Sequence, residues 1–231
     1  EDHNSFIRML GDGSDYGISL TYKTQSSPDG LAQAFLIGED FIGNQNVCLV
    51  LGDNIFWGQG FTTILQNAVK RKKGATVFGY QVRDPERFGV VEFDSYQKAI
   101  SIEEKPDNPK SNFAVTGLYF YDNDVVNLTK KLSYSKRGEL EISDLNNLYI
   151  KIHRLNGKIL SRGFNWYDTG TFDSLLEASQ VIHAKQTRQG LKIGCIEEIA
   201  LNNKWISKIE IKKAINFYGN CEYAKYLSKI I

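Results

Sequence analysis

The sequence contains little cysteine and histidine and has no long hydrophobic run. Its three cysteines are few, odd in number and far apart: Cys48, Cys195 and Cys221. This spacing fits neither a disulfide framework nor a zinc site, and it predicts a protein of the reducing cytoplasm. The three histidines are also isolated from one another, which favours surface or packing roles over metal binding.

Charge of one sign does not dominate either. The 28 basic and 27 acidic residues leave a net charge of +1, so no global field recruits nucleic acid or an anionic membrane. No apolar run approaches the roughly 20 residues needed to span a bilayer. The first residues, EDHNSFIRML, lack a basic segment followed by an apolar stretch, so we expect no secretory signal.

What the sequence does contain is a strand–helix–strand pattern near its middle. NVCLVLG (46–52) is a short apolar run ending at glycine, typical of a strand buried on both faces. GFTTILQNAVKRKKG (60–74) has helical spacing, with basic residues and a glycine at its end. ATVFGYQV (75–82) returns to strand. This order predicts a parallel α/β sheet with a crossover helix.

The remaining segments extend this α/β pattern. Their predicted elements are a hairpin (89–94 and 99–106), a strand (112–122), helices (123–132 and 139–156), a strand (158–170) and a helix (172–190). No linker rich in proline, glycine or serine separates domains. We therefore predict a single domain over residues 1–231, in which 172–231 is a mainly helical C-terminal portion.

Two aspartates follow predicted strands and raise the question of a metal site. Asp53 comes after CLVLG, and Asp168 comes after FNWY and before TGT. In open parallel α/β sheets, ligands bind beyond the carboxyl ends of the strands. The pair could therefore hold Mg²⁺, which prefers oxygen ligands and is usually shared with substrate phosphates. Each could instead be a turn or helix-capping residue, and for either aspartate taken singly that role is the commoner one.

Three further segments carry groups that could bind a ligand. Lys105 ends a predicted strand before Pro106, where it could contact a phosphate or simply be a solvated edge charge. QSSPDGLAQA (25–34) predicts a tight turn followed by a helix, whose amides could face a base or phosphate. Arg137 and Glu139 begin a predicted helix, as sugar contacts or as a solvated first turn. No Walker A, HExxH or G-x-G-x-x-G motif is present.

Taken in order, these segments resemble the sugar-1-phosphate nucleotidylyltransferases, and within that family most closely the glucose-1-phosphate thymidylyltransferases. The resemblance runs from Leu10 to about Leu201 through LGDG, QSSPDGLAQAF, LVLGDNIF, DPERFGVVEFD, EEKP, KSNFAVTGLYFYDNDVV, RGELEISD, WYDTGT, LLEAS, RQGLK and CIEEIA. It implies a Rossmann-like α/β core with a mixed, mostly parallel sheet flanked by helices. It also implies a cytoplasmic, Mg²⁺-dependent enzyme, usually a homotetramer. Its substrates would be dTTP and glucose 1-phosphate and its products dTDP-glucose and pyrophosphate. Such enzymes commonly supply dTDP-rhamnose and other deoxysugars for surface polysaccharides.

The resemblance also assigns expected roles to individual residues. Asp53 and Asp168 match the two Mg²⁺ ligands and, with Lys105, the catalytic positions. The expected nucleotide-binding residues are Gln25, Pro28, Gly30, Gly52 and Asp53, of which Gln25 and Gly30 read the thymine edge. The expected sugar-phosphate residues are Gly89, Glu104, Lys105, Val115, Arg137 and Glu139. Gly58, Arg162 and Glu198 match a secondary, regulatory nucleotide site.

Two departures from the family pattern leave alternatives open. The glycine-rich GGxGTRLxPxT loop that wraps the triphosphate is not found in the sequence, which begins about sixty residues into the pattern. The first βα unit is therefore expected to be missing, together with part of the triphosphate site. Phe88 stands where relatives commonly carry tyrosine. The alternatives are a catalytically silent homologue that binds a sugar nucleotide or a partner, and a uridylyl- or cytidylyltransferase of the same family.

Overall fold

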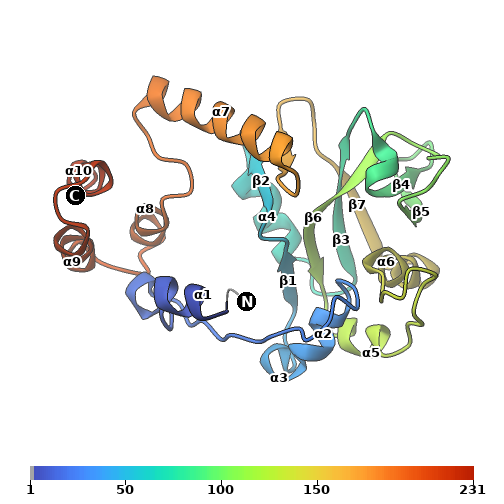
Figure 1. Cartoon of the computed structure of the whole chain (residues 1–231). Coiled ribbons are helices and arrows are strands. Elements are labelled where there is room, and N and C mark those ends of the chain that lie inside the picture. The colour runs from blue at the N-terminus through green and yellow to red at the C-terminus, as the bar shows by residue number, and fades with distance from the viewer. Residues whose placement is uncertain (1–2) are drawn as a thin grey trace. The chain divides into compact units, whose positions relative to one another are not determined.

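The computed structural model describes residues 3–231, which divide into two compact units (Figure 1). Unit 2 comprises Gln25–Ala178 and contains all the strands described below. Unit 1 comprises the described residues up to Thr24 together with Ser179–Ile231, and it is helical. Within residues 3–231, no helix is long and apolar enough to cross a membrane.

Unit 2 is built on a mixed sheet. Six strands among the described residues form it: β1 (Val47–Val50), β3 (Ala75–Gln81), β4 (Gly89–Phe93), β5 (Ala99–Glu104), β6 (Phe113–Tyr121) and β7 (Leu155–Ile159). The strands follow the order β5-β4-β6-β3-β7, and β1 pairs with β6. The long strand β6 is the centre of this arrangement, because β1, β3 and β4 all pair with it.

The expectation of a mixed sheet with a helical C-terminal part is confirmed, but that of a mostly parallel sheet is wrong for the described strands. Only β3 and β7 pair in parallel, and the other pairs are antiparallel. Strands β1 and β3 do run in the same direction, as the strand–helix–strand pattern predicts. However, β6 lies between them as their common antiparallel neighbour. The apolar pattern of a strand does not identify its neighbour, so the sequence did not indicate this insertion.

Strand β1 is not buried on both faces, contrary to the prediction from NVCLVLG. Its burial alternates between partly buried and exposed residues. Cys48 is exposed, and Val50 is 55% exposed. Among the described strands β1 pairs only with β6, so its other edge carries unpaired backbone groups.

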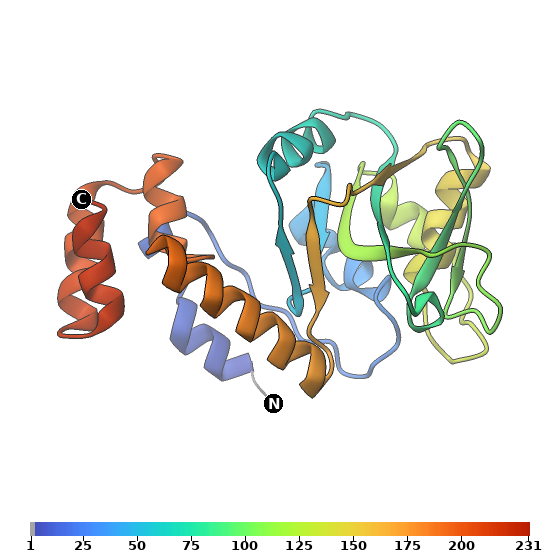
Figure 2. The same ribbon diagram turned by 90° about the horizontal axis from the view of Figure 1, so that it is seen from above.

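The two faces of the sheet are covered by different helices (Figure 2). Alternate residues of β6 explain this, because side chains on a strand point to opposite faces in turn. Tyr119 and Tyr121 pack in one apolar cluster with Leu145 of α6 (Ile142–Lys151). Leu118 packs in a second cluster with Ala68 of α4 (Phe61–Val69). Full burial of each large apolar side chain stabilises the fold by about 1.5–3 kcal/mol.

Shorter helices complete the first cluster. They are α2 (Gln33–Ile37), α3 (Glu39–Ile42) and α5 (Val125–Thr129). A buried polar network accompanies them, since Tyr121 Oη donates to Asn146 Oδ1 at 2.8 Å and Tyr149 Oη donates to Asp122 Oδ1 at 2.8 Å. Burial removes water from the Tyr149 hydroxyl, and the carboxylate of Asp122 disfavours a second negative charge beside it. Both effects raise the pKa of Tyr149 above its ordinary value.

Two predicted elements differ from the structure in their extent, and two strands were missed. The predicted helix 139–156 is shorter, because α6 ends at Lys151 and His153 adopts a left-handed φ of 56°. The chain then continues into β7, which the prediction missed. The predicted strand 158–170 is the end of β7 and a separate strand, β8 (Asn165–Asp168). Strand β8 pairs antiparallel with β2 (Asn54–Trp57) to form a two-stranded ribbon, and β2 was also missed.

Unit 1 contains α1 (His3–Leu10), the second part of α7 (Phe172–Gln189), α8 (Ile196–Asn202), α9 (Lys208–Tyr218) and α10 (Glu222–Lys229). Its core is small and includes a buried carboxylate, Glu197. The hydroxyl of Tyr218 donates to Glu197 at 2.8 Å, and that of Tyr223 also donates to it. These charge-assisted hydrogen bonds offset the cost of burying the carboxylate.

Candidate functional site

A hollow of about 190 Å³ opens in unit 2 where β4, β5, β6 and β8 come together. Its lining includes Gly89, Glu104, Lys105, Val115 and Asp168. These residues are far apart in the sequence, and each was predicted from the resemblance to line the sugar-phosphate or metal site. The fold therefore brings them to one place, while their individual roles remain predictions.

The β2–β8 ribbon places the two predicted metal-binding aspartates next to each other. Asn54, which follows Asp53, pairs with Asp168 across the ribbon. The backbone N–H and hydroxyl of Thr169 both donate to the carbonyl oxygen of Asp53, at 2.9 and 2.8 Å. A Cβ atom added to Gly170 would lie 3.3 Å from Asp168 Oδ1 and 3.8 Å from Asp53 Oδ2. Both carboxylates therefore border the same small space.

This donor set fits Mg²⁺ better than a cation that needs a complete protein cage. The described residues contain no cluster of three or more side chains of the types His, Cys, Asp and Glu that could hold a metal. Magnesium usually binds through one or two carboxylates and completes its octahedron with waters and substrate phosphates. Asp53 and Asp168 supply that minimum, and they could hold the ion only together with other oxygen ligands.

Asn54 holds Asp53 in position, and the sequence prediction did not include it. Its Oδ1 accepts hydrogen bonds from Gly117 N at 2.9 Å and from Trp166 Nε1 at 2.6 Å. Both partners can only donate, so Asn54 must turn its amide nitrogen outward. That nitrogen donates to Asp53 Oδ1 at 2.9 Å. The only sequence signal was an amide directly after the aspartate.

Lys105 has an unusual backbone conformation for a non-glycine residue. Its φ is 41°, in the left-handed region, and its N–H donates to the carbonyl of Phe88 at 3.0 Å. It follows directly after β5 and precedes Pro106, which cannot continue a ladder of hydrogen bonds. Such a conformation costs on the order of 1–3 kcal/mol and is common at ligand-binding positions. Here it places Lys105 on the wall of the hollow.

Gly89 and Glu104 face each other across the β4–β5 hairpin. The hydroxyl of Ser143 donates to Glu104 Oε2 at 2.5 Å. A Cβ added to Gly89 would lie 3.0 Å from that hydroxyl and 3.2 Å from the same carboxylate oxygen. A side chain at position 89 would therefore crowd the Glu104–Ser143 pair, which explains the glycine physically.

Arg137 lies among three carboxylates. Its guanidinium is 2.8 Å from Glu139, 3.6 Å from Glu141 and 3.7 Å from Glu104. Burial raises the pKa of Glu141, and the hydroxyl of Ser135 and the charge of Arg137 oppose this rise. Neither Arg137 nor Glu139 lines the hollow itself. They connect to it through Glu104.

The loop predicted to read the base is fixed to the rest of unit 2 at Gly30. This residue has a φ of +101°, and a Cβ atom here would lie 2.4 Å from the carbonyl oxygen of Leu140. Leu140 N donates to Asp29 O at 2.7 Å, and Ala32 N donates to Leu140 O at 3.2 Å. Gly30 therefore lies between two backbone hydrogen bonds, where only glycine fits.

The other predicted nucleotide-binding positions are less constrained. Gln25 and Pro28 lie on the same exposed loop as Gly30. Gly52 is also exposed, and a Cβ added there would meet no atom within 4 Å. Their predicted roles therefore rest on the resemblance rather than on a local requirement of the fold.

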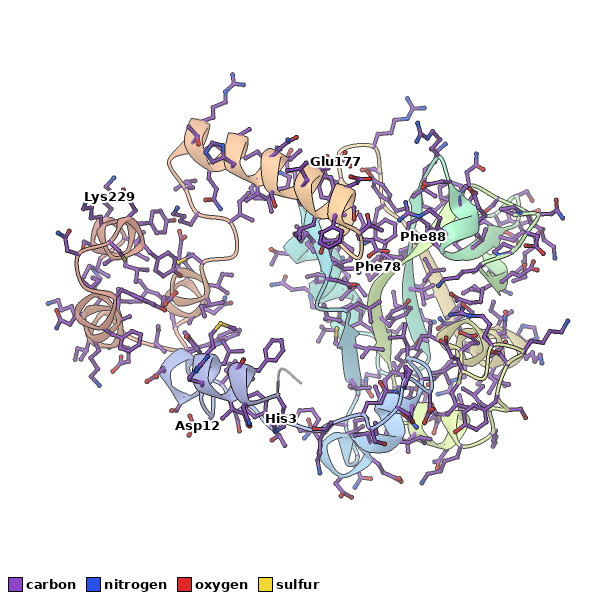
Figure 3. The ribbon with its side chains drawn as sticks, viewed as in Figure 1. His3, Asp12, Phe78, Phe88, Glu177 and Lys229 are labelled. Atoms are coloured by element: carbon purple, nitrogen blue, oxygen red, sulfur yellow. The ribbon has the colours of Figure 1, made fainter. Side chains whose placement is uncertain are left out.

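The hollow is also lined by Phe88, named above as a departure from the family pattern, and by Arg87 and Trp166, which were not predicted. Phe88 (Figure 3) packs against Trp166 with ring centroids 5.2 Å apart. The guanidinium of Arg87 lies 5.2 Å from the centroid of the Phe88 ring and 2.8 Å from Asp84. The hydrogen bond from Arg87 lowers the pKa of Asp84. The hollow thus has two cations, Arg87 and Lys105, beside an aromatic wall.

The predicted regulatory residues do not form one site within a unit. Gly58 has a packing reason of its own, because a Cβ atom there would lie 2.2 Å from the ring of Phe164. Arg162 is exposed, two residues before Phe164. Glu198 belongs to unit 1, where it accepts a 2.5 Å hydrogen bond from Tyr226 Oη. Their regulatory role remains a prediction.

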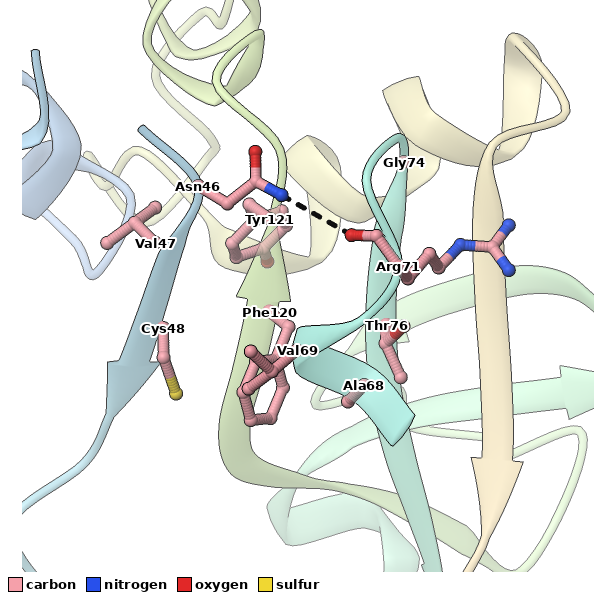
Figure 4. Close-up of a pocket in the computed structure, with 10 residues that line it drawn as sticks. All are labelled: Asn46, Val47, Cys48, Ala68, Val69, Arg71, Gly74, Thr76, Phe120 and Tyr121. Atoms are coloured by element: carbon pink, nitrogen blue, oxygen red, sulfur yellow. Dashed lines mark hydrogen bonds between the residues drawn. The ribbon is translucent and has the colours of Figure 1, made fainter. Parts of the chain in front are cut away.

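A second hollow, of about 150 Å³, is lined by residues of β1, β6, β3 and α4 (Figure 4). Cys48, Val69 and Phe120 contribute to its lining. At its rim, Asn46 Nδ2 donates to the carbonyl oxygen of Arg71 at 3.3 Å. None of the predicted site residues lines this hollow, so it is separate from the candidate site.

Comparison with known proteins identifies the family. Residues 1–185 match the nucleotidyl transferase family. The chain belongs to this family. It is 57% identical over 231 residues to the glucose-1-phosphate thymidylyltransferase of Neisseria meningitidis, covering 100% of this chain and 80% of that protein. It is 46% identical over 230 residues to the Mycobacterium tuberculosis protein of the same name, with 100% and 80% covered. The resemblance to thymidylyltransferases is therefore confirmed.

Solved structures support the same conclusion. A Bacillus anthracis protein assigned as a glucose-1-phosphate thymidylyltransferase, solved with a sucrose, has a TM-score of 0.70 and 40% identity. The match covers 84% of this chain and 75% of that one. A UDP-glucose pyrophosphorylase complexed with UDP-glucose has a TM-score of 0.62 at 24% identity, covering 71% and 66%. This second likeness concerns the fold alone.

Proposed function

We propose that this member of the nucleotidyl transferase family joins dTTP to glucose 1-phosphate, giving dTDP-glucose and pyrophosphate in a Mg²⁺-dependent reaction. The observation that carries the proposal is the convergence of Gly89, Glu104, Lys105, Val115 and Asp168 on one hollow of unit 2. The names of these two relatives and their identity over the whole chain support the choice of substrates.

The proposed reaction needs no protein nucleophile. A phosphate oxygen of glucose 1-phosphate attacks the α-phosphorus of dTTP in line, and the bond to the pyrophosphate oxygen breaks with its electron pair leaving on pyrophosphate. Positioning and neutralisation of charge supply most of the catalysis of such transfers. When bound by Asp53 and Asp168, Mg²⁺ would neutralise charge on the phosphate oxygens.

The side chains around the hollow have distinct proposed roles. The ammonium of Lys105 holds the sugar phosphate, and Arg87 adds a second positive charge beside it. Glu104 accepts hydrogen bonds from the sugar hydroxyls, in an orientation fixed by Ser143. Arg137 and Glu139 support that carboxylate from behind. Gln25, Pro28 and Gly30 form the base-binding loop, with Gly52 and Asp53 beside the nucleotide.

Other properties of the relatives extend the proposal. We infer a cytoplasmic homo-oligomer, tetrameric by resemblance, in which residues 1–231 form one nucleotidyltransferase domain with a mainly helical portion at 172–231. Its product would enter dTDP-rhamnose or another deoxysugar pathway. Gly58, Arg162 and Glu198 would contribute to a secondary nucleotide site.

A turnover assay tests this function. The chain is mixed with glucose 1-phosphate, MgCl₂ and either dTTP, UTP or CTP, and the sugar nucleotide and pyrophosphate are quantified by chromatography and mass spectrometry. The proposal expects dTDP-glucose and pyrophosphate in equal amounts, with dTTP as the best substrate. A preference for UTP or CTP would replace it with a related transferase.

A homologue that binds the sugar nucleotide without turnover is the second candidate that this assay can distinguish. This candidate expects Mg²⁺-dependent binding of dTDP-glucose without pyrophosphate release. Pyrophosphate release separates the two candidates, since both expect dTDP-glucose to bind. Isothermal titration of the same preparation measures that binding, and loss of both binding and turnover would contradict both candidates.

A further inference from the structure

The base-binding loop contains a hydrogen-bonded chain of three side chains, Asp29, Gln33 and Gln25. Ser27 Oγ donates to Asp29 Oδ2 at 2.6 Å, and Gln33 Nε2 donates to the same oxygen at 2.9 Å. Gln25 Nε2 then donates to Gln33 Oε1 at 2.7 Å and to the carbonyl of Gly30 at 3.2 Å. We call this set the amide chain.

The direction of every hydrogen bond in the amide chain follows from Asp29. An ionised carboxylate has no proton to donate, so Asp29 can only accept. Gln33 must therefore turn its NH₂ group toward Asp29, which leaves its oxygen toward Gln25. Gln25 must in turn present its NH₂ group to that oxygen. The hydrogen bonds from Ser27 and Gln33 lower the pKa of Asp29, so this end stays ionised at neutral pH.

The amide chain also determines which atom of Gln25 is available to a ligand. Both N–H bonds of its amide are engaged, one with Gln33 and one with Gly30. Within residues 3–231, no donor engages Gln25 Oε1, and no acceptor engages the backbone N–H of Gly30. The loop therefore offers a ligand one fixed acceptor and one fixed donor, five residues apart in the sequence.

These two groups match one class of pyrimidine. Thymine and uracil present an N3–H donor next to the O4 acceptor, so they pair with a glutamine oxygen and a backbone N–H. Cytosine presents an unprotonated N3 next to an N4 amino donor, which places acceptor against acceptor and donor against donor. A binding site whose groups are left unpaired by the wrong ligand discriminates strongly against it.

We propose that Gln33, fixed by Asp29, is a positioning residue for base selection: it locks Gln25 with its oxygen toward the base and so selects an imide pyrimidine over cytosine. This inference rests on the proposed function, in which Gln25 and Gly30 read the base. It goes further by placing the selectivity in two residues that do not contact the nucleotide. The amide chain does not distinguish thymine from uracil.

Equilibrium binding of dTTP, dUTP and dCTP in the presence of MgCl₂ tests the proposal by isothermal titration, without depending on turnover. The wild-type chain is expected to bind dTTP and dUTP at least about 10-fold more tightly than dCTP, because each unpaired polar group is costly. Gln33→Met keeps the length of the side chain and removes both hydrogen bonds. It is expected to weaken dTTP about 10-fold and to change dCTP much less, so the ratio approaches one.

A second variant reverses the orientation of the Gln25 amide. In Gln33→Lys the ammonium donates both to Asp29 and to Gln25, so Gln25 must turn its oxygen inward and its NH₂ group toward the base. The ratio of dCTP to dTTP affinity is then expected to rise above that of Gln33→Met. Gln66→Met, on the exposed surface of α4, is the matched control and should leave all three affinities unchanged. Thermal melting of each variant checks that it is folded.

The outcomes separate this inference from the proposed function. If the wild-type chain binds dTTP and dCTP equally, the assignment of the base-binding loop fails, and the inference fails with it. If the wild-type chain discriminates but both Gln33 variants weaken all three nucleotides by the same factor, Gln33 only supports the loop. That result would overturn the inference and leave the proposed function intact.

Discussion

The indole N–H of Trp166 donates a 2.6 Å hydrogen bond to Asn54 Oδ1, joining positions that are 112 residues apart in the sequence. This bond orients the amide of Asn54 so that its nitrogen donates to Asp53 Oδ1. The predicted metal ligand is therefore held by the two strands β2 and β8, rather than by a flexible turn. The site depends on this ribbon, which the sequence did not predict.

Replacing Asn54 tests that dependence. Asn54→Leu keeps the branching and the number of side-chain heavy atoms but leaves Trp166 Nε1 and Gly117 N without an acceptor. The free energy of unfolding is expected to fall by about 2–4 kcal/mol, since each unsatisfied donor costs roughly 1–3 kcal/mol. Chemical denaturation measures this change. Asn67→Leu on the exposed face of α4 is the control, and an equally small effect of both substitutions would contradict the role of Asn54.

Removal of one carboxylate tests the metal site. Asp53→Asn keeps the shape of the side chain and removes its charge. Addition of Mg²⁺ is expected to tighten dTTP binding at least about 10-fold in the wild-type chain and by no more than about 2-fold in the variant. Titrations with MgCl₂ or with EDTA give these ratios. Asp40→Asn, exposed on α3, should behave as wild type. An unchanged Mg²⁺ effect in Asp53→Asn would show that the ion binds elsewhere.

Two substitutions at Lys105 distinguish its role in ligand binding from the strain of its backbone. Both Lys105→Ala and Lys105→Gly remove the ammonium, so both are expected to weaken glucose 1-phosphate binding about 10- to 100-fold. Only glycine relieves the left-handed φ of 41°, so Lys105→Gly should melt at a higher temperature than Lys105→Ala. Calorimetry gives both quantities.

Lys110→Ala is the matched control for Lys105, because Lys110 is exposed and does not line the hollow. It should leave the affinity for glucose 1-phosphate unchanged. Equal affinities of the Lys105 variants and the wild-type chain would remove Lys105 from the proposed site.

Gly30 tests how the base-binding loop is attached. Gly30→Ala forces a Cβ atom against the carbonyl of Leu140 and imposes a left-handed conformation on alanine. The free energy of unfolding should fall by about 1–3 kcal/mol, and dTTP should bind more weakly. Gly163→Ala is the control, because an added Cβ meets no atom within 4 Å there. A Gly30→Ala protein as stable as this control would mean that the loop is not held at Leu140.

The sequence predicted the elements whose pattern is local. The β4–β5 hairpin and β6 lie close to their predicted ranges, because alternating apolar residues and a turn specify them directly. Strand β7 was missed because LYIKIHRLN continues the apolar spacing of α6, and the helix ends through the backbone of His153 rather than at a glycine or proline. Pairing partners were not predictable, since β6 follows β1 by more than sixty residues.

In the candidate site, too, the residues of local motifs were predictable and those that depend on distant partners were not. Gly89, Lys105 and Asp168 could be named because they belong to motifs that a resemblance can carry. Asn54 and Gln33 could not, because their importance arises only from partners that the fold brings near. A motif identifies a residue that contacts a ligand more readily than the residue that orients it.

A crystal structure of the chain with dTDP-glucose and Mg²⁺ tests the central claim most directly. The account predicts the thymine edge at Gln25 Oε1 and Gly30 N, the glucosyl phosphate beside Lys105, and the ion between Asp53 and Asp168. A ligand bound instead in the hollow beside β1, or a base whose edge does not meet Gln25, would contradict it.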